Sequence, residues 1–135
     1  MMRKQSILLA VLTVFLLCAG CAQQQTEDVQ QQPAQVQLGK YEMESSEEPL
    51  PPYVILEEGQ KFQMMYSAMM SYLPLGTYEV KGSDVVLTTE DGERRYTFRV
   101  DGDTLVFQKD KSSSVKLGKE EPVPDGAVFR LKQES

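Results

Sequence analysis

Residues 76–108 read GTYEVKGSDVVLTTEDGERRYTFRVDGDTLVFQ and form the most regular part of the chain. Apolar and polar residues alternate there in four short runs, at 77–81, 84–89, 94–100 and 104–108. Alternation with a period of two is typical of a strand with one buried face. Turn residues separate the runs, and Asp-Gly in particular favours hairpins because glycine accepts the positive φ of primed turns. The turns are Gly82-Ser83, Asp91-Gly92 and Asp101-Gly102. The stretch therefore predicts four strands in an antiparallel meander.

The same alternation assigns each side chain of the meander to one face of the sheet. Arg95, Thr97 and Arg99 are expected to point outward. The residues expected to point inward are Tyr78, Val80, Val85, Leu87, Tyr96, Phe98, Val100, Leu105 and Phe107.

Further strands are predicted upstream of the meander. Residues 40–44, 53–57 and 61–66 alternate in the same way, with Tyr41 and Met43, and later Phe62, Met64 and Tyr66, on the inward face. The intervening residues 45–52 are acidic and proline-rich, and are expected to form a loop because proline interrupts sheet hydrogen bonding.

Downstream of the meander, residues 109–118 are expected to form a polar crossing, with 115–117 as a short strand. Residues 127–132 predict a last strand, with Ala127, Phe129 and Leu131 inward. No window shows sustained helical periodicity.

The predicted fold is therefore all-β: a small antiparallel up-and-down meander barrel of about eight strands. About eight strands is the number at which a sheet closes around an interior filled by side chains or holding one small ligand. Closure also removes the open strand edges that invite aggregation.

The N-terminus has the layout of a secretory signal, with Arg3 and Lys4 followed by an apolar run at 7–19 and small residues. This run is too short to span a bilayer, which takes about 20 apolar residues. We therefore expect residues 1–20 to be a signal peptide that is removed.

Ala19-Gly20-Cys21 resembles the lipobox of bacterial lipoproteins, although Cys18 stands where that family usually has leucine. The resemblance implies cleavage before Cys21, attachment of diacylglycerol to its sulfur, and thus a palmitate-type lipid anchor that holds the protein to the cell membrane or the outer membrane, on its extracytoplasmic side. The alternative is an ordinary secretory signal cut near Ala19 or Ala22.

Residues 22–37 are glutamine-rich and almost free of large apolar side chains. Such a segment buries too little surface to offset its ordering entropy. We therefore expect residues 21–37 to comprise the lipidated cysteine and a flexible tether, and residues 38–135 to form the barrel domain.

Composition excludes several classes of function. The net charge is −6, which disfavours binding to nucleic acid. Histidine is absent, and Cys18 and Cys21 are the only cysteines, which excludes Ser-His-Asp and Cys-His catalysis as well as histidine- or cysteine-ligated zinc in the domain. We expect a protein that is not an enzyme and needs no cofactor.

Acidic residues are concentrated between Glu27 and Glu58, where Lys40 is the one base. A solvated segment that repels itself is our interpretation of this asymmetry. A site for a basic partner is the alternative.

The motifs Gly39-Lys40-Tyr41, Gly76-Thr77-Tyr78 and 125–129 (DGAVF), together with 103–107 (DTLVF), resemble those of small lipocalin-like domains in bacterial lipoproteins and exported proteins. This resemblance covers roughly residues 38–131 and implies a barrel. It implies no activity, because such barrels serve many roles.

Residues 64–75 depart from the alternation: the segment is apolar and holds four of the seven methionines. It predicts a loop folded over one barrel end, where methionine fills irregular gaps. Such a loop could also be the mouth of an apolar ligand site, a landing surface for another protein, or a thioether site for Cu(I). The candidate binding residues are Met65, Met69, Met70, Tyr72 and Leu73.

Two acidic motifs are further candidates for sites. Asp101-Gly102-Asp103 could attract calcium, but it offers two carboxylates where six to eight oxygens are needed, so a hairpin turn is the preferred interpretation. Glu57 and Glu58 are adjacent in a strand and so point to opposite faces, which does not suit glycoside hydrolysis.

The sequence thus predicts a lipid-anchored binding module of the cell envelope, with a small apolar molecule as its possible ligand. The alternative is a protein-directed envelope factor, an inhibitor or accessory subunit of an envelope enzyme that uses the methionine-rich loop as its contact surface.

Overall fold

The computed structural model describes residues 34–134. The predicted signal peptide, Cys21 and the first part of the predicted tether lie outside the described residues. No helix in the described part of the chain is long and apolar enough to cross a membrane.

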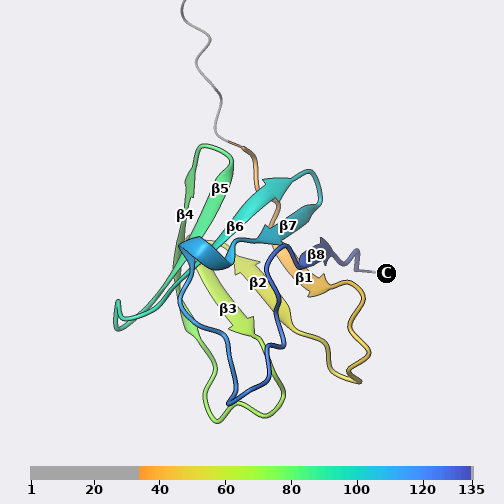
Figure 1. The fold of residues 1–135 in the computed structure, drawn as a ribbon. Helices are drawn as coiled ribbons and strands as arrows, with labels where there is room; N and C mark the ends of the chain where they lie inside the picture. The colour runs from red at the N-terminus through yellow and green to blue at the C-terminus, as the bar shows by residue number, and fades with distance from the viewer. Residues whose placement is uncertain (1–33, 135) are drawn as a thin grey trace, which may run out of the picture. The chain divides into compact units, whose positions relative to one another are not determined.

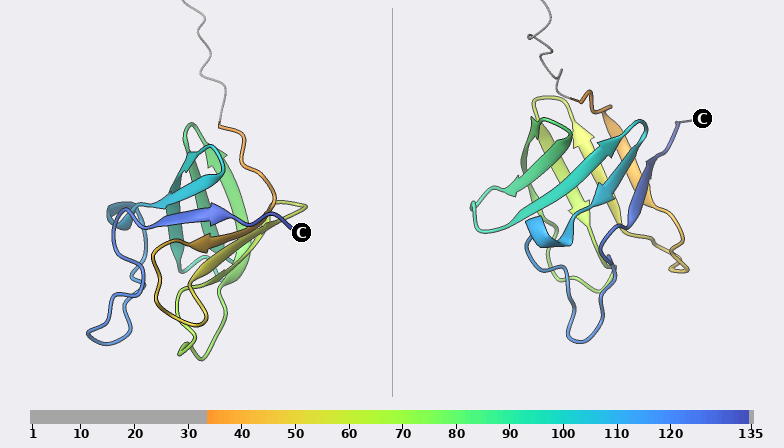
Figure 2. Two further views of the ribbon diagram at one scale, coloured as in Figure 1. Left: turned by 90° about the vertical axis from the view of Figure 1, so that its right-hand side faces the viewer. Right: turned by 45° about the horizontal axis from the view of Figure 1, so that its top comes forward.

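Eight antiparallel strands close into a barrel in the order of the sequence (Figures 1 and 2). The strands are β1 (Gly39–Met43), β2 (Tyr53–Glu57), β3 (Lys61–Met65), β4 (Leu75–Lys81), β5 (Asp84–Thr89), β6 (Arg95–Asp101), β7 (Thr104–Phe107) and β8 (Val128–Leu131). The barrel closes where β1 pairs with β8, with Tyr41 opposite Leu131 and Met43 opposite Phe129. The predicted up-and-down barrel is confirmed.

Aromatic side chains fill the interior of the barrel. The ring centroid of Phe98 lies 5.4 Å from that of Phe107 and 5.3 Å from that of Phe129. Every residue predicted to point inward in the meander is buried or packs against the core. The largest fully buried side chains are Tyr41, Tyr96, Phe62, Phe98, Phe107 and Phe129.

The crossing between β7 and β8 corrects one predicted element. No strand forms at 115–117; instead a short 3-10 helix, η1 (Lys109–Lys111), is followed by irregular chain with one isolated bridge between Leu117 and Glu120. Val115 is buried in the core cluster. The crossing is held by its serine side chains and by packing of Val115, and not by strand pairing.

The same crossing explains why Thr97 is buried although it was predicted to point outward. Strand β7 is paired with β6 only from Phe98 onward, so the first residues of β6 have free backbone groups. Ser112 and Ser113 occupy that place: their hydroxyls accept the N–H groups of Thr97 and Arg95, at 2.8 and 2.9 Å. The Thr97 hydroxyl donates to the carbonyl of Lys111, at 2.9 Å, beneath this cover.

The two ends of the barrel carry different connections. At the proximal end, turns at 58–60, 82–83 and 102–103 join the strands, and the chain arrives beside Gly82, whose carbonyl accepts the N–H of Ala34 at 2.9 Å. At the distal end the longer connections 44–52, 66–74, 90–94 and 108–127 lie together (Figure 1). An even number of antiparallel strands places both chain termini at the proximal end, away from these longer loops.

The predicted tether includes residues 34–37, and these lie against the barrel. Val36 packs on the core, and the carbonyl of Gln37 accepts the hydroxyl of Tyr41 at 2.7 Å. The chain is therefore fixed to the proximal end before β1 begins.

Candidate functional site

Exposed apolar side chains gather at the distal end of the barrel. Of the six large hydrophobic residues with high exposure among residues 34–134, Leu38 alone lies near the proximal end. The others belong to the distal connections or the strand start beside them: Leu50, Met69, Tyr72, Leu73 and Leu75. Clusters of exposed apolar side chains mark interaction sites more often than single ones do.

The loop at 66–74, which we call the Met-rich loop, has an ordered turn at its tip. The N–H of Met69 donates to the Ser67 hydroxyl at 3.2 Å, and the N–H of Met70 donates to the Ser67 carbonyl at 3.3 Å. The sulfur of Met70 accepts the N–H of Tyr66 at 3.4 Å. These bonds turn Met69 outward, where its side chain is 86% exposed.

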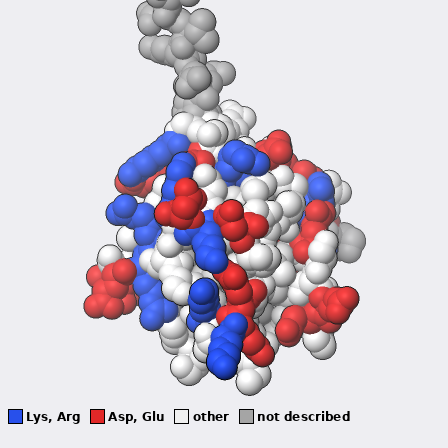
Figure 3. Space-filling model, in the orientation of Figure 1, with Lys and Arg blue, Asp and Glu red and all other residues white. Residues whose placement is uncertain are grey.

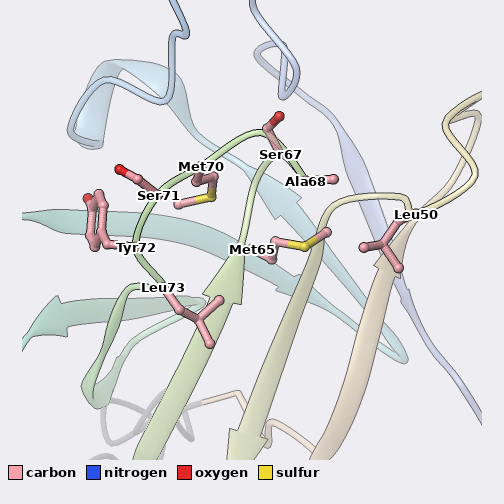
Figure 4. Close-up of a pocket in the computed structure, with 8 residues that line it drawn as sticks. All are labelled: Leu50, Met65, Ser67, Ala68, Met70, Ser71, Tyr72 and Leu73. Carbon is pink, nitrogen blue, oxygen red and sulfur yellow. The ribbon is translucent and has the colours of Figure 1, made fainter.

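A pocket of about 310 Å³ lies between the Met-rich loop and the loop at 44–52. In Figure 4 the side chains of Met65 and Leu50 point toward one another across it, while Tyr72 lies on the other side of the Met-rich loop. The lining residues are Leu50, Met65, Ser67, Ala68, Met70, Ser71, Tyr72 and Leu73. The pocket is open and mainly apolar, so it offers shape and hydrophobic contact but no reacting group.

A second pocket, of about 230 Å³, lies on the opposite flank of the Met-rich loop, against the loop at 90–94. The guanidinium carbon of Arg94 lies 4.7 Å from the centre of the Tyr72 ring, a cation–π contact that holds the two loops together. The Met-rich loop therefore stands between two hollows.

The loop at 90–94 is ordered by hydrogen bonds of its own. The Asp91 carboxylate accepts the hydroxyl of Thr89 and, at 3.0 Å, the N–H of Glu93. These hydrogen bonds favour the ionised form and lower the pKa of Asp91 below its usual value. Arg94 is thereby presented to Tyr72 from a defined turn.

Of the five predicted site residues, four come together around the first pocket and one does not. Met65, Met70, Tyr72 and Leu73 line it, whereas Met69 points into solvent. Met65 is buried although it lines this pocket.

Two contributors were missed by sequence reasoning. Leu50 lies in the acidic loop at 44–52, and Arg94 is the last residue of the loop at 90–94. The predicted meander was sufficient to find both. Alternate connections of an up-and-down barrel lie at the same end, so the loops at 44–52 and 90–94 must be the neighbours of the loop at 66–74.

The structure does not bring the four methionines of the 64–75 segment to a single point. Met64 is fully buried in the barrel interior, whereas Met69 is in solvent. A thioether site for Cu(I) would need these sulfurs to converge.

The acidic motifs have structural partners. Asp103 accepts Nη1 of Arg130 at 3.1 Å, and the Asp101 carbonyl accepts the Thr104 hydroxyl at 2.7 Å, with Gly102 in a left-handed conformation between them. Glu57 is the cross-strand neighbour of Lys61. Within residues 34–134, no three acidic, histidine or cysteine side chains converge as metal ligands would.

One buried side-chain polar atom has no hydrogen-bond partner among the described residues: the hydroxyl of Tyr96. Burial disfavours the phenolate and, with the nearby Tyr66 phenol, raises the pKa of Tyr96 to about 12. This hydroxyl belongs to the barrel interior and not to the two pockets.

No family model, curated protein or solved structure matches the chain.

Proposed function

We propose that this protein is a lipid-anchored module of the cell envelope that binds another protein through the Met-rich loop and catalyses no reaction. The observation that carries the proposal is the contrast between a filled barrel interior and the exposed apolar residues at the distal end, which include Met69, Tyr72 and Leu73.

The direction of the chain supports this proposal. Residues 34–37 are fixed at the proximal end, and the Met-rich loop lies at the distal end. Lipid attachment at Cys21, implied by the resemblance of Ala19-Gly20-Cys21 to a lipobox, would reach the domain through this proximal segment. The distal loops lie at the other end of the barrel and are free of it.

The absence of histidine from the chain, and of cysteine after Cys21, supports a role without catalysis. The usual nucleophile–base pairs need one of these residues.

A small apolar ligand is the second candidate, favoured by the first pocket. Its volume of about 310 Å³ reaches the lower end of the range for ligand sites. The pocket is shallow, however, and its walls come from loops and not from the barrel interior.

Site-specific photocrosslinking in the native envelope tests the proposal. The photoreactive residue p-benzoylphenylalanine replaces Met69 in one variant and Glu79, an exposed residue of β4, in the control. We expect Met69 to crosslink to one discrete protein and Glu79 to give no such product. A second substitution, Leu73→Ser, should abolish the Met69 product; equal labelling from both positions, or lipid adducts alone, would contradict a protein-directed role.

The lipid anchor is tested separately, by mass spectrometry of the intact protein. The intact mass of the native protein should exceed that of the chain starting at Cys21 by the mass of the attached diacylglycerol and any further acyl group, and Cys21→Ser should remove this lipid. A native protein without acyl groups would leave the binding role standing but refute the anchor.

A further inference from the structure

We infer that the partner segment bound at the distal end is basic and apolar: its apolar side chains fill the hollows beside the Met-rich loop, and its lysines or arginines pair with carboxylates of the two flanking loops. This inference rests on the proposed function and names the chemistry of the partner.

The order of the strands determines which loops are neighbours at the distal end. Around the rim of the distal end, the Met-rich loop lies between the loop at 44–52 and the loop at 90–94, since each joins neighbouring strands of the barrel. The first pocket reaches Leu50 on one side, and the second reaches Glu90 and Arg94 on the other. A bound segment that lies across the Met-rich loop therefore meets both flanking loops.

Both flanking loops carry exposed carboxylates. Glu47 and Glu48 belong to one loop, Glu90 and Glu93 to the other, and no base among residues 34–134 forms an ion pair with any of them. Figure 3 shows acidic side chains over these two loops, at opposite sides of the distal end. The Met-rich loop and the two hollows beside it form an apolar strip between these carboxylates. A cation on the bound segment can therefore reach a carboxylate on either side of the strip.

The two flanking loops are acidic overall, and the exposed base Arg95 directly follows one of them at the start of β6. Arg94 is the one base in the two flanking loops, and its guanidinium lies over the Tyr72 ring. The lysines of the distal end belong to the crossing at 108–127, on the far side of the rim, where Lys109 pairs with Glu121. An apolar strip with acid on both flanks complements a basic amphipathic segment, because opposite charges at the rim set orientation and the rate of encounter.

The same charges argue against a membrane as the occupant. Anionic headgroups attract lysine and arginine, whereas the carboxylates beside the Met-rich loop repel such headgroups. The exposed apolar side chains alone could insert into lipid, so vesicles form one arm of the test.

The test uses the purified full chain in neutral detergent and three synthetic peptides. The first alternates leucine and lysine with helical spacing, the second replaces each lysine by glutamate, and the third replaces each leucine by serine. Binding is measured by fluorescence anisotropy. We expect the leucine–lysine peptide to bind, and each of the other two to bind at least about tenfold more weakly, because affinity needs both charge and apolar contact.

Two matched variants place the site. One carries Glu47→Gln, Glu48→Gln, Glu90→Gln and Glu93→Gln at the distal end. The control carries Glu57→Gln, Glu58→Gln, Glu79→Gln and Asp101→Asn toward the proximal end, which changes the net charge by the same amount. The distal variant should lose about tenfold in affinity and most of the salt dependence, and the control should stay within about twofold.

Three results would overturn the inference: no binding of the leucine–lysine peptide up to about 1 mM, equal loss in the two variants, or tighter binding to vesicles of anionic lipid than to the peptide. Failure here can be separated from failure of the proposed function. If Met69 crosslinks to a discrete protein whose contact peptide is acidic or uncharged, the protein-directed role stands and the inferred chemistry of the partner is wrong.

Discussion

Met64 and Met69 belong to the same methionine-rich segment, yet Met64 is fully buried in the barrel and Met69 is 86% exposed. The first lies in strand β3 and points into the barrel interior, within the core cluster. The second stands at the tip of a loop held by a few hydrogen bonds to Ser67. The difference teaches that methionines of one segment serve different ends: Met64 and Met70 pack in or against the core, whereas the exposed Met69 needs an explanation other than folding.

The largest change in the free energy of unfolding is expected at the centre of the barrel. Phe98→Ala removes a ring packed between Phe107 and Phe129 and should lower the free energy of unfolding by about 3–5 kcal/mol. Met69→Ala should change it by less than about 0.5 kcal/mol, as surface substitutions do. Urea denaturation followed by circular dichroism measures both. A comparable loss from Met69→Ala would show that the Met-rich loop is part of the stabilising core.

The junction between loop and wall gives the next largest effect. Gly76 follows the first residue of β4, and a Cβ placed there would overlap the carbonyl oxygen of Thr88 and lie 2.9 Å from Cε1 of Phe62. Gly76→Ala should therefore cost about 1–3 kcal/mol through overpacking. Gly92→Ala is a useful control, because its Cβ would meet nothing within 4 Å and the strain comes only from its φ of 73°. A neutral Gly76→Ala would mean that β4 starts later than Leu75.

A smaller change of opposite sign is expected inside the barrel. The Tyr96 hydroxyl is buried without a partner, so Tyr96→Phe should leave packing intact and raise the free energy of unfolding by about 1 kcal/mol. A loss of stability would show that the hydroxyl does have a partner in the folded protein.

The same hydroxyl predicts how stability depends on alkaline pH. The folded protein keeps the Tyr96 proton up to a pKa of about 12, whereas the unfolded chain loses it near the ordinary value of 10.0. The folded state binds more protons in that interval, so stability should fall as pH rises from about 10 to about 12 and be unaffected below. Tyr96→Phe should make this decline shallower but not abolish it, because burial also raises the pKa of Tyr41 and of Tyr78. Denaturation at pH 9 and pH 11 measures the change.

Local signals were sufficient where connections are short. Alternation predicted the β5 bounds, 84–89, without error, and the turns at Gly82 and Gly102 have the positive φ expected of primed hairpins. Once strands and tight turns are known, an antiparallel meander follows, because each strand can pair only with the next. The inward positions of Phe98, Phe107 and Phe129 follow from the same period of two.

Local signals failed where a residue depends on distant chain. The strand predicted at 115–117 is absent and Thr97 is buried, because the crossing after β7 binds the free backbone of β6 through Ser112 and Ser113. No residue close to Thr97 in the sequence indicates that Ser112 and Ser113 will cover it. The site shows the same limit: the Met-rich loop was recognisable from its own composition, but Leu50 and Arg94 join it only in the folded chain.

The sequence by itself determined the fold class, the inward face of each strand and the unusual composition of the 64–75 segment, since these depend on residue type and spacing along a few neighbouring positions. The tertiary structure decided which loops meet at the distal end, that Met64 and Met69 occupy opposite environments, and that carboxylates stand on both sides of an apolar strip. The physical reason is barrel closure, which makes neighbours of groups that lie tens of residues apart in the sequence.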